Sequence, residues 1–388
     1  MDLKFLSKNE PDFGLFVEVL KGIRAASTVL SAEVLIDEEI KKIILLDYLD
    51  NEYYPPPVSQ WGDNTFNLNA YSEKKKAYKK YYRSTINFYR KMGYSLLADM
   101  TFISNFESLN SVVNKITDTS QLNKGFRHWA VEDKGMIKTW DDFETFPWKT
   151  AEDLNNEYLE LLDSIKQMLP DGMKVGVIAS LFEELLEWIF GYQNFFYLLV
   201  DNSGLVKAVC DKVGEIMLNF YESVINHEAV GCIFHADDLG YKTGTMLSIK
   251  DLNSLIFPWF KKYAGVAHKS NKPFYLHSCG KKDEIIDLLI NDIGIDAIHA
   301  FEDVSYPVIQ YKETWGEKVG IIGGADVDKI TRFNEKDLRN YIDKILDSCA
   351  LKGRYVFGSG NSIPNYVPVN NYLIMMDECN NWSKNNLI

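Results

Sequence analysis

One short segment shapes the interpretation of the whole chain: Pro273-Phe274-Tyr275-Leu276-His277-Ser278-Cys279-Gly280. Its first half is an apolar run with the length and composition of a buried strand. Its second half places an imidazole and a thiol two residues apart, followed by a glycine turn. Histidine and cysteine are common zinc ligands, and a turn after a strand can direct both at one ion. The segment therefore predicts a buried strand that ends at half of a zinc site.

Apolar runs of this kind recur along the chain and are rich in β-branched and aromatic residues. They cover residues 28–36, 94–102, 174–180, 230–235, 273–278, 296–300, 318–323 and 354–358. Between them lie longer amphipathic segments, such as 205–227 and 335–351, whose apolar residues recur at helical spacing. This alternation predicts an α/β protein, namely a single (β/α)8 TIM barrel. A doubly wound open sheet is the alternative, but the further helical segment at 369–382 favours the barrel.

Two connections are longer than the loops of a compact domain usually are, and both belong to the first half of the chain. They cover residues 50–77 and 106–149. The first contains three consecutive prolines and would suit a lid or an insert that faces a partner. We expect one barrel domain over residues 1–388, with an N-terminal helical extension and these long inserts after the early strands.

The composition excludes several classes of partner. The formal charge of −13 opposes nucleic acid or an anionic membrane as the main partner. No apolar run approaches the roughly 20 residues of a membrane span, and the first residues show no signal-peptide pattern. The five cysteines are scattered without CxxC spacing, which indicates reduced thiols rather than disulfides. We therefore expect a cytoplasmic protein.

Polar residues gather where the expected strands end, which in a (β/α)8 barrel is the rim that carries the active site. Carboxylates occur there at Glu33, Asp99, Asp237, Asp238, Glu302 and Asp326, and the other candidates are His235, His277, Cys279, Ser359 and Asn361. Glu183 and Glu184 follow the third strand in the same way. Carboxylates together with histidines and a thiol indicate a metal site or a proton-transfer site.

Three of these candidates also have a purely structural interpretation. His235 can be a hydrogen-bonded histidine of the core as readily as a ligand. Asp237 and Asp238 precede Leu239-Gly240 and can cap a helix or hold a turn. At this point both interpretations stay open for all three residues.

The remaining candidates divide in the same manner. Cys279 can be an inert buried thiol, although its place beside His277 favours a ligand, and Glu302 can be a neighbour of a helix N-cap. Glu33 lies inside a strand, where an unpaired buried carboxylate is costly, so a structural role is harder to assign. His299, in the middle of the sixth expected strand, is expected to alternate away from the pocket.

Four segments of the second half of the chain resemble the uroporphyrinogen decarboxylase superfamily. They are Leu276-His277-Ser278-Cys279-Gly280, Gly294-Ile295-Asp296-Ala297-Ile298, Gly323-Gly324-Ala325-Asp326 and Gly358-Ser359-Gly360-Asn361-Ser362-Ile363-Pro364. The likeness is best over residues 170–388, and residues 16–22 look like the opening helix of that superfamily. The resemblance implies a single (β/α)8 barrel that exists as a monomer or a homodimer.

One branch of the superfamily comprises the uroporphyrinogen decarboxylases, which use no metal or organic cofactor and bind an octacarboxylate tetrapyrrole. Their catalytic aspartate would correspond to Asp99. Ser359 stands where their late histidine is expected, and the N-terminal segment offers only Lys21 and Arg24 as cationic partners for a polyanion. This branch remains the alternative, together with a non-catalytic barrel that binds a corrinoid or a tetrapyrrole.

The other branch comprises cobalamin-linked methyltransferases, which bind zinc through a His-x-Cys pair and a later cysteine. His277 and Cys279 match the pair, but no cysteine occurs near Gly360 or Asn361. A carboxylate or an imidazole would then complete the ligand set, and the candidates are Asp238, Glu302, Glu33 and His235.

The resemblance therefore implies a zinc-dependent methyltransferase that moves a methyl group between a small methylated substrate, such as a methyl ether, and a corrinoid carried by a partner protein. Zinc would act as a Lewis acid, and Asp237 would accept or donate the accompanying proton. The residues expected to bind substrate are Glu33, His235, Asp326, Ser359 and Asn361.

Overall fold

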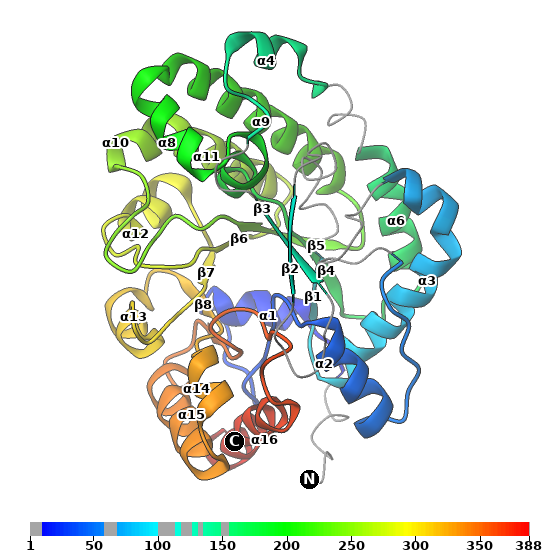
Figure 1. The fold of residues 1–388 in the computed structure, drawn as a ribbon. Helices are drawn as coiled ribbons and strands as arrows, with labels where there is room; N and C mark the ends of the chain where they lie inside the picture. The colour runs from blue at the N-terminus through cyan, green and yellow to red at the C-terminus, as the bar shows by residue number, and fades with distance from the viewer. Residues whose placement is uncertain are drawn as a thin grey trace.

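The computed structural model describes residues 10–57, 68–99, 113–117, 126–130, 135–148 and 155–387. Side chains are described in these ranges except at 68–74, 113–117, 126–130 and 155–157. The end of the second expected strand (100–102) and much of the two expected inserts therefore lie outside the described residues. Figure 1 shows a central sheet with helices arranged around it.

Within the described residues the central sheet has seven strands, in the order β1-β4-β5-β6-β7-β8-β9. They are β1 Leu96–Asp99, β4 Lys174–Val177, β5 Val230–Ala236, β6 Phe274–His277, β7 Ala297–His299, β8 Gly320–Ile322 and β9 Tyr355–Val356. Every neighbouring pair is parallel. Each strand coincides with a predicted apolar run, so the predicted alternation of strands and helices is confirmed.

The first predicted strand, 28–36, is not a regular strand. It runs beside β9 and the residues after it, joined by isolated bridges at Ser31 and Ile36. Between the two bridges the Ser359 N–H donates to Oε1 of Glu33, at 2.9 Å, instead of to a main-chain carbonyl. A side chain thus interrupts the ladder, and the segment takes the eighth place of the (β/α)8 barrel without strand geometry.

Helix α1 (Phe13–Leu20) closes the end of the barrel at which the strands begin. The Phe13 N–H donates to the carbonyl of Gly172, just before β4, at 2.8 Å. Phe16 packs on Tyr275 of β6 with ring centroids 6.3 Å apart, and these rings belong to the apolar cluster that fills the barrel. The expected N-terminal helical extension is therefore present, and it leaves the opposite end of the barrel for the polar side chains.

The outer layer consists of helices that alternate with the strands, as Figure 1 shows. The longer ones are α3 Leu68–Lys91, α6 Asn155–Lys166, α8 Tyr192–Asp201, α9 Ser203–Val224, α11 Phe257–Lys269, α13 Val308–Trp315, α15 Glu335–Cys349 and α16 Val369–Asn386. Short helices are α2 Glu38–Ile43, α4 Trp140–Thr145, α7 Phe182–Glu184, α10 Ile249–Asp251, α12 Ile286–Leu288 and α14 Val327–Arg332, and π-helical turns cover η2 Ile44–Tyr48, η4 Leu185–Ile189, η5 Leu252–Ile256 and η6 Leu289–Ile293. Helix α16 is the predicted helix after the last strand. None of the helices in the described ranges has the length and apolarity that crossing a membrane requires.

The insert expected at 50–77 contains the start of a long helix. Helix α3 has 24 residues and begins inside this range. Its lysines at 75, 76, 79 and 80 are exposed, and the side chains of Tyr78, Tyr81 and Tyr82 on the same helix are buried. In the second expected insert, 106–149, the antiparallel pair β2 Val113–Thr117 and β3 Phe126–Ala130 is described, as is helix α4.

Candidate metal centre

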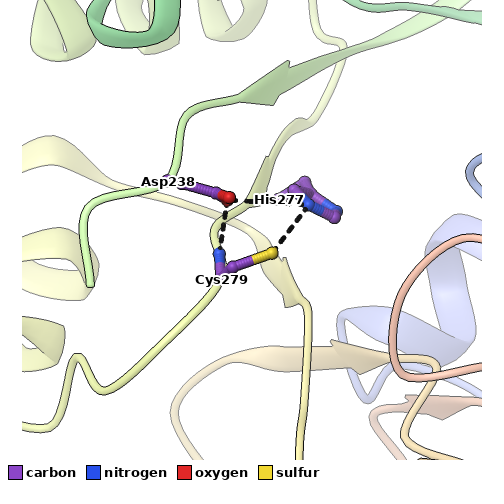
Figure 2. Close-up of side chains that lie close together, drawn as sticks. All are labelled: Asp238, His277 and Cys279. Carbon is purple, nitrogen blue, oxygen red and sulfur yellow. Dashed lines mark hydrogen bonds and ion pairs between the residues drawn. The ribbon is translucent and has the colours of Figure 1, made fainter. Parts of the chain in front are cut away.

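Three potential ligands meet at the C-terminal ends of two adjacent strands. His277 is the last residue of β6, Cys279 lies in the turn after it, and Asp238 lies two residues beyond β5. The parallel register pairs Ala236 with His277, which brings the two strand ends side by side. Figure 2 shows the three side chains close together, with contacts that join each of them to the other two residues. One ligand atom from each lies within 4.8 Å of the others, and no second such group occurs in the described part of the chain.

The distances in this group suit a zinc ion. Nε2 of His277 lies 3.5 Å from Sγ of Cys279 and 3.8 Å from Oδ1 of Asp238. Two donors bound tetrahedrally to zinc, at about 2.0 to 2.3 Å, lie roughly 3.3 to 3.8 Å apart. The set of one imidazole, one thiol and one carboxylate is also a chemistry that zinc accepts. These three residues therefore fit the metal that the sequence predicts.

The main chain holds the group in place. The Cys279 N–H donates to Oδ1 of Asp238 at 2.7 Å, and the Gly240 N–H donates to the carbonyl of Cys279 at 3.2 Å. Gly280 has φ of +74°, and a Cβ there would lie 2.3 Å from the main chain of Gly240. Only glycine fits such a close approach of two loops. The glycine after the His-x-Cys pair therefore sets the distance between the two strand ends.

His299 lies behind His277, although the sequence predicted that it would point away from the pocket. Nδ1 of His299 is 2.7 Å from Nδ1 of His277. The prediction was wrong because Ile298 packs in the apolar cluster between the sheet and the outer helices. Side chains alternate along a strand, so its neighbours Ala297 and His299 face the barrel interior. Burial lowers the pKa of His277, and it lowers the pKa of His299 well below its ordinary value. Burial thus favours the neutral form of both rings.

Lys282 is a component that the sequence did not predict. It is only 4% exposed, and Nζ donates to the carbonyls of Gly280, at 3.1 Å, and Ala300, at 3.0 Å. Burial lowers the pKa of Lys282 to about 8, against the opposing attraction of Cys279 and Asp238. In the sequence, a lysine three residues after the thiol would be interpreted as a solvated residue. No local pattern indicates that its side chain is buried.

The thiol of Cys279 has a second polar neighbour in Asn361. Nδ2 of Asn361 donates to Sγ of Cys279 at 3.3 Å. Burial, followed by the charge of Asp238, raises the pKa of Cys279 above its ordinary value. Asn361 was expected to bind substrate, and the structure places it against the thiol, where the resemblance had implied the later cysteine.

Glu302 and Asp326 are not part of the group of three ligands. Glu302 accepts a hydrogen bond from the hydroxyl of Ser305 at 3.5 Å. Asp326 caps α14 by accepting from the Asp328 N–H at 2.8 Å, and its other oxygen accepts from the Asp303 N–H at 2.7 Å. Both carboxylates hold the loops that follow β7 and β8.

His235 and Asp237 form a buried pair beneath the rim, and both are 0% exposed. Nε2–H of His235 donates to Oδ2 of Asp237 at 2.8 Å, and Nδ1 of His235 lies 2.8 Å from the hydroxyl of Tyr221. Asp237 also accepts from the N–H groups of Leu181 and Glu183, each at 2.9 Å. The pair thus holds the turn after β4, as the structural interpretation of the sequence had allowed.

This turn places Glu183 beside Asp238. The carboxyl of Glu183 accepts a hydrogen bond from the Asp238 N–H, and its pKa is raised well above the ordinary value by burial and then by the charge of Asp238. Glu183 followed the third predicted strand, but nothing in its own segment distinguished it from Glu184. Only the tertiary structure shows that the carboxyl of Glu183 lies next to the candidate metal ligands.

Asp99 is hydrogen-bonded to the outer helices, and Glu33 to the segment that follows β9. Oδ1 of Asp99 accepts from the hydroxyl of Tyr82 of α3 at 2.9 Å, and Oδ2 accepts from the hydroxyl of Tyr158 of α6 at 2.7 Å. Glu33 contacts Ser359 through both oxygens, and burial raises its pKa from 4.5 to about 8.

The proton arrangement around Ser359 explains how Glu33 is accommodated. The Ser359 hydroxyl is in hydrogen-bond contact with the carboxyl of Glu33 and also with the carbonyl of Asn361. One hydroxyl proton cannot serve two acceptors. A protonated Glu33 donates to the hydroxyl, which then donates to the Asn361 carbonyl. Every polar atom of the contact is then satisfied without a buried charge.

Fold and site together define a (β/α)8 barrel that carries its polar residues at the C-terminal ends of its strands. The chain belongs to the uroporphyrinogen decarboxylase (URO-D) family, whose model matches residues 135–382. A comparison with curated protein sequences finds no significant match.

Solved structures with a similar fold extend over nearly the whole chain. A methyltransferase from Methanosarcina mazei is 12% identical with a TM-score of 0.63, and the similarity covers 94% of this chain and 97% of that chain. A B12-independent methionine synthase from Shewanella sp. W3-18-1, in complex with selenomethionine, is 9% identical with a TM-score of 0.48, and the similarity covers 81% of this chain and 90% of that chain. At such low identity the likeness to the Methanosarcina mazei methyltransferase concerns the fold alone.

Proposed function

We propose that the chain is a zinc-dependent methyltransferase that moves a methyl group between a small methylated substrate and a corrinoid carried by a separate protein. The observation that carries the proposal is the convergence of Asp238, His277 and Cys279 within 4.8 Å of one another. Membership of the family and the likeness of the fold to a methyltransferase support it. The His-x-Cys pair of this chain also matches the pair of the corrinoid-linked branch.

Zinc bound here would supply Lewis-acid chemistry at the oxygen or sulfur that loses or gains the methyl group. The three side chains would hold it and leave a fourth position for the substrate, as catalytic zinc sites do. Asn361, through its hydrogen bond to Sγ of Cys279, would keep the sulfur in place. The buried ammonium of Lys282, drawn to the charges of Cys279 and Asp238, would offset part of the negative charge of the ligands.

The substrate also needs a proton when an alkoxide or thiolate leaves. Asp237 was expected to supply it, but its two oxygens hold the main chain of the neighbouring turn and His235. Glu183 is better placed because its carboxyl accepts the N–H of the candidate ligand Asp238, and burial raises its pKa. We assign the proton transfer to Glu183 and the positioning of Glu183 to Asp237.

The decarboxylase alternative draws less support from the site. Both oxygens of Asp99 accept tyrosine hydroxyls of the outer helices. Arg24 lies just beyond α1, at the end of the barrel where the strands begin, and pairs with Glu18 at 3.6 Å. A polyanionic substrate at the opposite rim would not reach it.

Elemental mass spectrometry of the purified, untagged protein tests the proposal. We expect about one zinc per chain, lost in the variants His277→Ala and Cys279→Ala and retained in the matched control Cys379→Ala, which removes a buried thiol of α16. A protein that stays free of zinc after zinc is added would overturn the proposal. With zinc present, methyl donors are then screened for methylation of cob(I)alamin, and loss of transfer in Glu183→Gln with zinc retained would support the proton role.

A further inference from the structure

We propose that His299 is a positioning residue that fixes the tautomer of His277, so that the unprotonated Nε2 of His277 faces Cys279 and Asp238. The inference rests on the proposed zinc centre and deepens it, because it concerns how the imidazole ligand is prepared for a metal. The observation that carries the inference is a chain of two contacts, which runs from the ligand His277 through His299 to a main-chain carbonyl.

The direction of the proton in each contact follows from the acceptor at the end of the chain. Nε2 of His299 lies 3.3 Å from the carbonyl oxygen of Ser359, which can only accept. Nε2 of His299 therefore carries the proton. The ring is 0% exposed, and its nitrogens contact an imidazole and a carbonyl rather than a carboxylate, so a buried charge would be costly and Nδ1 is an acceptor. Nδ1 of His277, 2.7 Å away, must then be the donor. The proton of His277 thus sits on Nδ1, and Nε2 keeps its lone pair.

Nε2 is also the atom of His277 that faces the other two ligands. It lies 3.5 Å from Sγ of Cys279 and 3.8 Å from Oδ1 of Asp238. With the opposite tautomer, an N–H would point at the place where the ion belongs, and the ring would have to lose that proton before it could bind. A hydrogen bond from the other nitrogen of a ligating histidine is known to fix the tautomer and the ring plane.

The second histidine is itself rigid, so it can impose this choice. His299 is 0% exposed, and its ring packs edge-on against Phe234, with centroids 6.1 Å apart. The carbonyl that accepts the hydrogen bond from Nε2 of His299 belongs to Ser359. The N–H of Ser359 in turn donates to Glu33 at 2.9 Å. The parallel register aligns His277 with His299 on neighbouring strands. Neither ring can turn without breaking a buried contact.

The tautomer can be measured on the wild-type protein without metal and without activity. Histidine labelled with ¹⁵N shows by long-range ¹H–¹⁵N correlation which ring nitrogen carries the proton, and the six histidines are assigned by single substitutions, including His277→Gln. We expect His277 as the Nδ1–H tautomer and His299 as the Nε2–H tautomer. A metal-free His277 that carries its proton on Nε2 would overturn the inference.

Two substitutions then connect the tautomer to zinc binding. His299→Leu removes the acceptor, and we expect it to shift His277 towards the Nε2–H tautomer and weaken zinc binding about 10- to 100-fold. His299→Asn keeps an oxygen acceptor facing His277. We expect its zinc affinity to be closer to that of the wild type than to that of His299→Leu. Far-ultraviolet circular dichroism and thermal unfolding show whether each variant is folded.

The outcomes separate this inference from the proposed function. If the wild type binds no zinc, the proposed function fails, while the tautomer spectrum still decides the role of His299. If the wild type binds zinc and folded His299→Leu binds it equally tightly, with His277 unchanged, the proposed function stands and the inference fails. Equal loss in His299→Leu and His299→Asn would also count against it, since both would then act only through packing.

Discussion

Asn361 donates a hydrogen bond through Nδ2 to Sγ of Cys279 at 3.3 Å, although 82 positions separate the two residues in the sequence. The amide belongs to the segment after β9, and its own Oδ1 accepts from the Ser362 N–H at 2.8 Å. Position 361 therefore lies against the sulfur of the candidate metal centre. The ends of β5 and β6 and this segment each contribute a residue next to Cys279, namely Asp238, His277 and Asn361, and each role can be tested.

A cysteine at position 361 should strengthen zinc binding. Asn361→Cys would place a second thiolate where an amide now lies, and thiolates are strong zinc ligands. We expect affinity to rise roughly tenfold or more, which corresponds to about 1.4 kcal/mol for each factor of ten. Competition with a chelator measures the affinity, and the sulfur-to-metal absorption of the cobalt form should increase. Asn361→Ser is the control, and an equal gain in both variants would show that the new sulfur is not a ligand.

The adjacent residues Asp237 and Asp238 should respond differently to the same change. Asp238→Asn can still accept the Cys279 N–H through its amide oxygen, but it loses the anionic ligand. We expect a protein of nearly unchanged stability whose zinc affinity falls roughly tenfold or more. Asp237 instead accepts three hydrogen bonds. Asp237→Asn replaces one of its oxygens with an N–H₂ group, which cannot accept them.

For Asp237→Asn we expect a loss of about 1 to 3 kcal/mol in the free energy of unfolding, the usual cost of an unsatisfied buried contact. Urea unfolding and chelator competition on both variants provide the comparison. If Asp238→Asn retained full zinc affinity, Asp238 would not be a ligand.

Glu33 should make the protein less stable as the pH rises. Its pKa is raised from 4.5 to about 8 by burial, so between these values the folded state holds a proton that the unfolded state has released. The unfolding free energy then falls with increasing pH, by at most about 1.4 kcal/mol per pH unit, and this contribution levels off above pH 8. Glu33→Gln keeps the hydrogen bonds of the protonated form and cannot ionise.

The stability advantage of Glu33→Gln over the wild type should therefore grow from pH 5 to pH 8. Urea unfolding of both proteins at several pH values measures it. A difference that does not change with pH would mean that Glu33 ionises in the folded state as it does in water.

Asp99 should matter for folding and not for zinc. Asp99→Leu removes the acceptor of the hydroxyls of Tyr82 and Tyr158, and we expect unfolding to become easier by about 1 to 3 kcal/mol. Tyr82→Phe removes one of the two contacts and should cost less. Zinc content should be unchanged in both variants. An Asp99 variant of normal stability that lacks an activity found in the wild type would instead assign Asp99 a catalytic role.

Local patterns were sufficient for most of the fold and for one pair of ligands. The strands and helices are encoded by periodicities within a few residues, and His277 and Cys279 are adjacent enough for one turn to hold both. Glu33 was also recognisable as unusual, because a carboxylate inside an apolar run needs an explanation wherever it lies. What local patterns could not show is that its partner would be Ser359, 326 residues away.

The sequence alone thus specified a (β/α)8 barrel with a His-x-Cys turn at a strand end, because both follow from patterns among residues that are close in the sequence. The tertiary structure decided which groups surround that turn: Asp238 and Glu183 from the strands before it, His299 from the strand after it, and Asn361 from the segment after the last strand, β9. Their selection depends on the parallel register of β5, β6 and β7 and on barrel closure, which are long-range properties. A strand of three residues such as β7 is too short to reveal from its own pattern which side faces inward, and for that reason His299 could be placed only by the packing of Ile298 against the outer helices.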